Sequence, residues 1–303
     1  MDMTTHAPGP SWQPPAISTR GAAPDATRMD TVELLVRDLD TMTTYYRDGV
    51  LLDVLDQSGP TATLGRGGVP IMLLRQEKDL PDANPRSAGL YHTAIAFEDQ
   101  RRLASSLLSV ARHAPRTFTG ASDHLVSEAF YFTDPEGNGL ELYHDRPRSE
   151  WMVSADGFVT MAADPVDPNA FLQQWFDPDS LDQGPSAAIG HVHLQVGDIP
   201  TAKQFYVGVL GFDITVEFDT ALFVSAGGYH HHLGMNTWHS AGSAPRAATL
   251  GLGDVRVLVP TRTDIEALNE RLRFHGIPAA DDGRTLRFRD PWNTTLAVSP
   301  EHT

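Results

Sequence analysis

Histidine is the residue type that first points to chemistry in this sequence, which has 13 histidines and no cysteine. His92 and His191 each open a strand-like run. Glu141 lies within the apolar segment Leu140–Tyr143, and His232 ends a run of three histidines. Imidazoles and carboxylates bind divalent ions of intermediate hardness. We therefore predict that these four side chains hold a metal, with Fe(II) favoured over Mn(II), Ni(II) and Zn(II).

Three further side chains are candidates for acting on a substrate beside such a metal. His193 follows His191 by two residues and Tyr143 follows Glu141 by two, so strand alternation directs each toward the side of its neighbour. The same alternation gives His230 the face of the last histidine in its run. We predict that His193 and His230 transfer protons or orient substrate, and that the Tyr143 phenol hydrogen-bonds a substrate oxygen. Packing roles are the alternative for each.

A repeated order of elements positions these residues. Four times, a strand-like run is followed by an amphipathic helical segment and three further strands. The four opening runs begin at Thr31, His92, His191 and Asp254. Copies two and four close on similar segments, Phe132–Leu142 and Phe288–Val298, each with an Asp-Pro turn. We infer that one βαβββ module has been duplicated.

The pairing of modules decides which residues meet. Two curled sheets placed edge to edge form a cup, lined by residues from the opening and final strands. In the final strands we expect the inward residues to be Met72, Glu141, His232 and Ala297. Pairing of copies two and three collects His92, Glu141, His191 and His232. Pairing of copies three and four would leave His191, His232 and Asp254. We favour the first arrangement because it uses every strong candidate, while sequential pairing or a split set without metal stays open.

The predicted fold class is α+β, with four βαβββ modules paired into two curled-sheet barrels. We expect a disordered, proline-rich arm over residues 1–27 and an N-terminal domain with modules one and two over 28–146. A connector over 147–188 would carry a short helix near Asn169–Phe176, and modules three and four would form a C-terminal domain over 189–300.

Composition limits the partners. The net charge of −16 argues against nucleic acid and anionic membrane surfaces. No apolar run is long enough to span a bilayer, and the N-terminus lacks the apolar stretch of a signal peptide. The absence of cysteine excludes disulfides and thiolate metal sites and fits a cytoplasmic protein. A homodimer is left open.

Several segments resemble the vicinal oxygen chelate superfamily, which includes glyoxalases, bleomycin resistance proteins and extradiol dioxygenases. His92–Ile95 and His191–Asp198 resemble its metal-binding first strands, and Asp134–Tyr143 resembles its glutamate-bearing last strand. Ala221–Trp238 and Asp145–Trp151 are similar to the bacterial catechol 2,3-dioxygenase-like branch. The resemblance covers about residues 29–300.

The resemblance implies a metal-dependent oxidoreductase that cleaves a catecholic ring beside one hydroxyl, with a small aromatic substrate and dioxygen as partners. It also implies a site in the C-terminal half, where this chain has Asp254 and Ala297 in place of a histidine and a glutamate. Four protein ligands would crowd out dioxygen, so a glyoxalase-type lyase or isomerase is the first alternative. A metal-free binding protein of the resistance type is the second.

Overall fold

The computed structural model describes residues 23–155, 158–178 and 187–301. Most of the predicted N-terminal arm, residues 1–22, lies outside the described residues. The last part of that arm is ordered: the Ala23 backbone N–H donates to the Gly211 carbonyl at 2.7 Å, and Ala23 packs against the core. Residues 23–27 therefore belong to the folded body.

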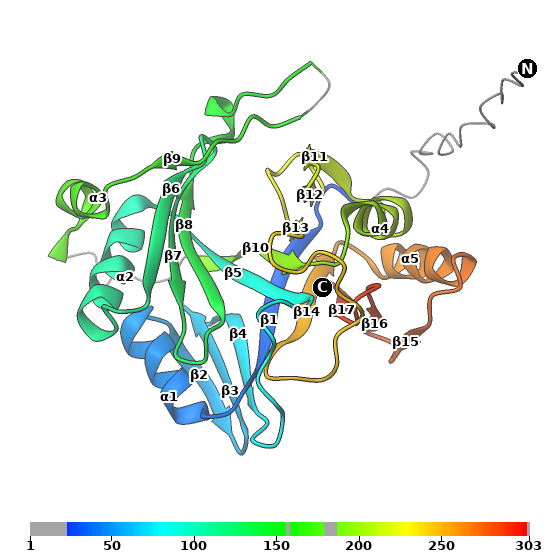
Figure 1. Ribbon diagram of the computed structural model, residues 1–303, viewed down its shortest axis with the longest axis horizontal. Helices are drawn as coiled ribbons and strands as arrows, with labels where there is room; N and C mark the ends of the chain where they lie inside the picture. The colour runs from blue at the N-terminus through cyan, green and yellow to red at the C-terminus, as the bar shows by residue number, and fades with distance from the viewer. Residues whose placement is uncertain (1–22, 156–157, 179–186, 302–303) are drawn as a thin grey trace, which may run out of the picture.

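Four βαβββ modules follow one another along the chain, as predicted (Figure 1). The first comprises β1 (Arg28–Val36), α1 (Leu39–Thr44), the π-helical segment η1 (Tyr45–Gly49), β2 (Asp53–Ser58), β3 (Thr61–Arg66) and β4 (Val69–Gln76). The second comprises β5 (Gly89–Phe97), α2 (Gln100–His113), β6 (Phe118–Asp123), β7 (Ser127–Thr133) and β8 (Gly139–Asp145).

The third module comprises β10 (Ala187–Gln195), α4 (Ile199–Lys203), η4 (Gln204–Val209), β11 (Asp213–Phe218), β12 (Ala221–Ser225) and β13 (Leu233–Asn236). The fourth comprises β14 (Gly251–Val259), α5 (Arg262–Phe274), β15 (Ala279–Asp281), β16 (Leu286–Arg289) and β17 (Thr295–Pro300). The connector carries η2 (Arg148–Glu150), β9 (Asp164–Pro165) and α3 (Pro168–Trp175), and α3 confirms the helix expected there.

The sheets join modules from opposite halves of the chain. One sheet has the order β15-β16-β17-β14-β1-β4-β3-β2 and combines modules one and four. The other has the order β11-β12-β13-β10-β5-β8-β7-β6-β9 and combines modules two and three. The favoured pairing is therefore the observed one. Each sheet therefore contains strands from both of the sequential domains predicted over 28–146 and 189–300, so neither domain forms a sheet by itself. Both sheets are open and do not close into the predicted barrels.

Helices, rather than sheets, hold each half of the chain together. Ser106 and Ser109 of α2 donate to the carbonyls of Val50 and Asp48 at the end of the first helix, at 2.8 and 2.7 Å. In the second half the Arg271 guanidinium on α5 donates to the Val209 carbonyl at 3.1 Å. Figure 1 shows α1 and α2 on one side of the molecule and α4 and α5 on the other. The two modules of each half are thus connected through their helices, whereas each sheet combines one module from each half.

The acidic residue after each opening strand has a structural role. Asp38, Asp99 and Asp198 each accept a hydrogen bond from a backbone N–H in the first turn of the following helix. In the fourth module Thr261 takes this place and forms a capping box with Asp264. A side-chain oxygen that accepts from an otherwise unpaired N–H stabilises a helix by about 1 kcal/mol. The repeated acidic position is therefore a helix N-cap.

The two Asp-Pro turns hold buried carboxylates that link neighbouring modules. The Tyr46 hydroxyl donates to Asp134 at 3.0 Å, and the Tyr206 hydroxyl donates to Asp290 at 2.9 Å. Burial raises the pKa of Asp134 to about 6 even though it accepts several hydrogen bonds. Each Asp-Pro turn therefore also anchors a helical segment of the preceding module.

Replacing Tyr206 with phenylalanine is expected to lower the free energy of unfolding by about 1–3 kcal/mol, because Asp290 would lose a hydrogen-bond donor inside the protein. Urea denaturation followed by circular dichroism measures this change. Phe274→Ala, at a side chain that is 87% exposed, is the control and should shift stability by less than about 0.5 kcal/mol. Equal stability of the Tyr206 variant and the wild type would contradict the anchoring role.

Across the described residues, no helix combines the length and apolar character needed to cross a bilayer.

Candidate metal centre

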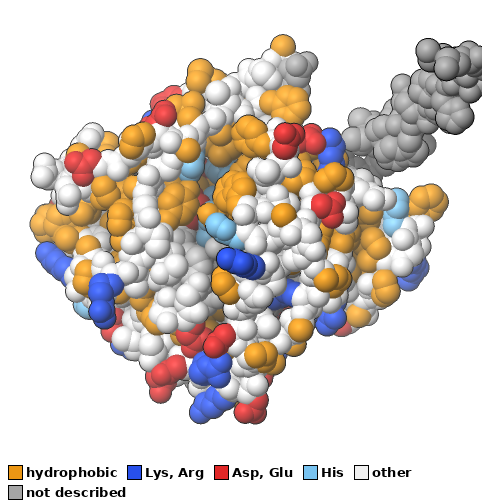
Figure 2. Space-filling model, in the orientation of Figure 1, with side chains coloured by type: hydrophobic (Ala, Val, Ile, Leu, Met, Phe, Trp, Pro, Cys, Tyr) orange, Lys and Arg blue, Asp and Glu red, His pale blue; other side chains and the backbone are white. Residues whose placement is uncertain are grey.

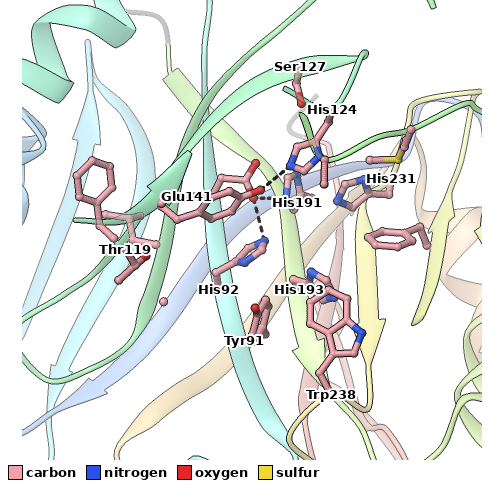
Figure 3. A pocket seen from close by; sticks show the side chains of 18 of the residues that line it. Tyr91, His92, Thr119, His124, Ser127, Glu141, His191, His193, His231 and Trp238 are labelled. Atoms are coloured by element: carbon pink, nitrogen blue, oxygen red, sulfur yellow. Dashed lines mark hydrogen bonds and ion pairs between the residues drawn. The ribbon is translucent and has the colours of Figure 1, made fainter. Parts of the chain in front are cut away.

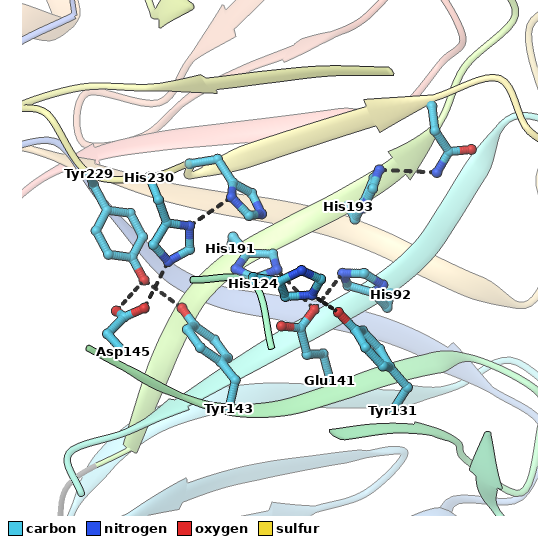
Figure 4. A network of polar contacts seen from close by, with 12 residues as sticks. His92, His124, Tyr131, Glu141, Tyr143, Asp145, His191, His193, Tyr229 and His230 are labelled. Atoms are coloured by element: carbon cyan, nitrogen blue, oxygen red, sulfur yellow. Dashed lines mark hydrogen bonds and ion pairs between the residues drawn. The ribbon is translucent and has the colours of Figure 1, made fainter. Parts of the chain in front are cut away.

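Three buried side chains converge where modules two and three join. His92 on β5 places Nε2 2.9 Å from Glu141 Oε2, and His191 on β10 places Nε2 3.2 Å from the same oxygen. Strand register explains the meeting: β5 lies between β8 and β10, parallel to the first and antiparallel to the second. Figure 4 shows the two imidazoles on either side of the Glu141 carboxylate. One cation could contact all three groups.

Electrostatics favour the forms of these groups that bind cations. Burial alone would raise the pKa of Glu141, but the neighbouring His191 and His92 imidazoles hold it well below its ordinary value. Burial lowers the pKa of His191 to about 4, against the attraction of Glu141. At neutral pH the site therefore offers a carboxylate and a neutral imidazole, which are the protonation states required for metal ligation.

Unsatisfied polar atoms test whether a metal fits here. His92 Nε2 is buried and, although close to Glu141, makes no hydrogen bond within the described part of the chain. Buried polar atoms without a partner are rare and call for an explanation such as an ion. Two imidazoles and one carboxylate with open positions are the donor set of non-haem iron oxygenases. The residues present therefore fit a divalent metal such as Fe(II).

A cavity of about 750 Å³ opens over these three side chains. It is bounded by strands of module two, by β11 and β12 of module three, and by connector residues Met161–Ala163. Figure 2 shows histidine side chains within a hollow on this face, with hydrophobic side chains around it. Figure 3 shows His92, Glu141, His191, His193 and His231 directed toward the cavity. Its volume lies in the range of pockets that enclose small-molecule ligands.

His193 lines this cavity, in agreement with its predicted position. The Trp238 backbone N–H donates to Asn236 Oδ1 at 3.1 Å, which directs the Asn236 amide nitrogen toward His193 Nε2 at 3.0 Å. His193 Nε2 must therefore accept, so the ring is neutral with its proton on Nδ1. Space for the ring is provided by Gly234, where a Cβ would lie only 3.1 Å from it.

A histidine–tyrosine pair that was not predicted from the sequence lies in the cavity wall. His124 Nδ1 lies 2.6 Å from the Ala162 carbonyl and must donate to it, so in the neutral ring Nε2 accepts from the Tyr131 hydroxyl at 2.6 Å. Tyr131 also pairs across the strands with Glu141. The register of β7 against β8 places Tyr131 directly opposite the glutamate, and alternation along β7 alone does not reveal this.

Tyr143 and His230 do not line the cavity, contrary to the prediction that they contact substrate. The Tyr143 hydroxyl lies 2.6 Å from the Tyr229 hydroxyl, which donates to Asp145 at 2.7 Å. His230 Nε2 contacts the other Asp145 oxygen at 2.8 Å. Figure 4 shows this network beside the Glu141 cluster. Tyr143 occupies the space left by Gly190, where a Cβ would meet its hydroxyl, so the phenol is buried away from the cavity.

The structure places His232 away from the cluster, which corrects its assignment as a ligand. Its Nδ1 accepts from the Ala226 backbone N–H at 3.2 Å and lies 3.3 Å from the Ser225 hydroxyl. The histidine run precedes β13, so strand alternation does not apply to it. By register, the position equivalent to Glu141 is Gly234.

His231, which was not predicted as a site residue, reaches the cavity instead. Its ring centroid lies 4.0 Å from that of His191. His191, His230 and His231 form a second group of converging donors, but His231 Nδ1 already faces His230 Nδ1 at 2.8 Å. This second group has no carboxylate, and the first group is the better match to a divalent cation.

The corresponding positions in the other sheet hold no such cluster among the residues described. Thr31 and Asp254 occupy the places of His92 and His191, and Asp254 faces Arg287 at 3.7 Å. Glu33 in the same sheet pairs with Arg75 at 2.8 Å. Asp254 therefore cannot complete a set with His191, because the two lie in different sheets.

Comparisons with known proteins agree with this architecture. The chain matches the family described as Glyoxalase/Bleomycin resistance protein/Dioxygenase superfamily over residues 28–142 and 188–298. The protein belongs to this superfamily. It is 34% identical over 270 residues to a catechol-2,3-dioxygenase of Bacillus subtilis, a match that covers 88% of this chain and 94% of the relative.

Solved structures of superfamily members share the fold. A Bacillus subtilis protein proposed to be a dioxygenase aligns with a TM-score of 0.63 at 12% identity, covering 93% of this chain and 87% of that one. Glyoxalase I from Zea mays aligns with a TM-score of 0.56 at 17% identity, covering 91% and 92% of the two chains. Identities this low establish the common architecture alone.

Proposed function

We propose that the protein is an extradiol-type dioxygenase that cleaves a catecholic ring and holds Fe(II) through His92, Glu141 and His191. The observation that carries the proposal is the convergence of two imidazole nitrogens on one carboxylate oxygen at the floor of an aromatic-lined cavity. The 34% identity to a catechol-2,3-dioxygenase supports the same reaction. Mn(II), Ni(II) and Zn(II) are alternative occupants of this donor set.

When bound, a divalent ion of this kind polarises coordinated substrate oxygens and leaves positions open for dioxygen. The chain's own residues orient the ring and move its protons. The Tyr131 hydroxyl can accept a hydrogen bond from a ring hydroxyl while it donates to His124 Nε2. The hydrogen bond with Asn236 fixes His193 in one tautomer. The His193 ring lines the cavity beside Tyr91, and the centroids of the two rings lie 5.0 Å apart.

Four protein ligands would leave no room for dioxygen at the metal, but a set of three protein ligands does not have this difficulty. With His232 directed toward Ser225 and Ala226, the residues that would hold a divalent ion are His92, Glu141 and His191, a three-residue set of the kind that leaves room for substrate and dioxygen in non-haem iron oxygenases. A glyoxalase-type reaction with four protein ligands would need a further donor, for which His231 is a candidate because it lines the same cavity and its ring centroid lies 4.0 Å from that of His191.

Oxygen uptake with catechol tests the proposal. Protein loaded with Fe(II) under nitrogen should consume about one dioxygen per catechol and form a yellow ring-fission product, as an oxygen electrode and absorbance spectroscopy measure. Turnover of a hemithioacetal without oxygen uptake would instead favour the glyoxalase-type reaction. Protein that never retains metal and shows neither activity would favour a binding protein.

A further inference from the structure

Beyond the candidate metal centre, the cavity lining combines an apolar part with neutral polar groups, which include the hydroxyls of Thr119, Ser127, Tyr131 and Thr133 and the imidazoles of His124, His193 and His231. Around Glu141 and the histidines, the remaining lining includes Phe132, Leu140, Met161, Val216, Phe218 and Phe223. The described lining contains neither lysine nor arginine, and Glu141 is its only carboxylate. A substrate substituent that extends toward these apolar side chains would therefore contact hydrocarbon, and no lysine or arginine of the described lining could pair with an anionic one.

The arginines that follow β8 in the sequence already have partners elsewhere in the protein. Arg146 lies 2.6 Å from Asp123, and Arg148 donates to the Gly227 carbonyl at 2.9 Å. The connector segments outside the described residues, 156–157 and 179–186, contain no lysine or arginine in the sequence. The net charge of −16 adds a potential that disfavours anions. A buried carboxylate without a partner is strongly unfavourable.

Two large apolar side chains of the lining remain exposed to solvent. Phe218 at the end of β11 is 56% exposed, and Trp238 after β13 is 48% exposed. Trp238 also packs against Tyr91 and His193, at centroid distances of 5.3 and 5.5 Å (Figure 3). Exposed apolar residues at the entrance of a pocket indicate a surface that an apolar ligand covers.

From this distribution we infer that the cavity selects neutral catechols with an apolar ring substituent and rejects catechols with a carboxylate side chain, with Phe218 as a specificity-determining residue at the entrance. The inference rests on the proposed ring cleavage for the identity of the ring. The apolar and uncharged character of the substituent is inferred only from the side chains that line the cavity. At about 750 Å³ the cavity also exceeds what a bare catechol ring would fill.

Two substrate pairs separate this inference from the proposed function. Fe(II)-loaded protein should have a kcat/KM at least about tenfold higher for 4-ethylcatechol than for 3,4-dihydroxyphenylacetate, a factor that corresponds to about 1.4 kcal/mol. Metal-free protein, titrated calorimetrically, should bind 4-ethylphenol more tightly than 4-hydroxyphenylacetate. Failure to cleave either catechol defeats the proposed function but leaves the binding preference to be measured. Equal or tighter binding of the anion overturns the inference.

Phe218→Arg tests the entrance directly. A cation there should improve binding of 4-hydroxyphenylacetate and narrow the preference for 4-ethylphenol by about tenfold. Phe274→Arg, which adds the same charge at an 87% exposed position on α5, should leave both affinities unchanged. If the Phe218 variant has a lowered melting temperature, Trp238→Arg serves in its place. An unchanged preference in a folded entrance variant would overturn the role of this rim.

Discussion

Glu141→Gln is expected to reduce iron retention by more than about 100-fold, since even residues that merely support a ligand change metal affinity by 10–100-fold. The substitution keeps the shape of the side chain. It removes the negative charge that would attract a cation held together with His92 and His191. Ring cleavage should fall with iron content. The measurement is elemental analysis after anaerobic loading with one equivalent of Fe(II) and dialysis.

Glu217→Gln is the matched control for that experiment. Glu217 pairs with Lys203 at 2.8 Å on the surface, so its loss alters a carboxylate without touching the cavity. Surface ion pairs of this kind contribute about 0–1 kcal/mol, and iron retention should equal that of the wild type. A Glu141→Gln protein with close to one iron per chain would rule out Glu141 as a ligand.

His92→Ala and His232→Ala are expected to separate metal binding from stability. His92→Ala should abolish iron retention, because it removes one of three converging donors. His232→Ala should keep the iron and lower the free energy of unfolding by about 1–3 kcal/mol, because the Ala226 N–H would lose its buried acceptor. Iron content and urea denaturation of both variants provide the comparison.

The reverse outcome would return His232 to the ligand set predicted from the sequence and remove His92 from it. Loss of iron in a stably folded His232→Ala protein, with retention in His92→Ala, would mean that His232 is the ligand. His191→Ala is a useful third variant, since both candidate donor groups contain it and it should lose iron in either case.

The connector between the two halves of the chain contributes to the candidate site between modules two and three. The donors come from both halves of the chain, and the connector supplies Met161–Ala163 to the cavity wall. The strand β9 of the connector also extends the sheet, where Ser122 pairs with Pro165. The connector predicted as a link between domains is therefore part of the cavity and of the sheet.

The sequence alone determined the module repeat and singled out the three side chains that converge in the candidate metal centre. His92 and His191 could be found because each begins a strand-like run of the repeated module, and Glu141 because it lies in the matching final strand. Alternation within a strand is a local property of the backbone, so it can be read without knowing the fold. The favoured pairing of modules two and three followed from the same residues.

Only the tertiary structure decided the rest. Tyr131 and His124 reach the cavity through the pairing of β7 with β8 and through a connector carbonyl 38 residues away in the chain. His232 turns away because the histidine run lies before β13, where no ladder fixes alternate faces. Register between strands and the path of a turn depend on contacts between distant segments, and periodicity within one segment does not encode them.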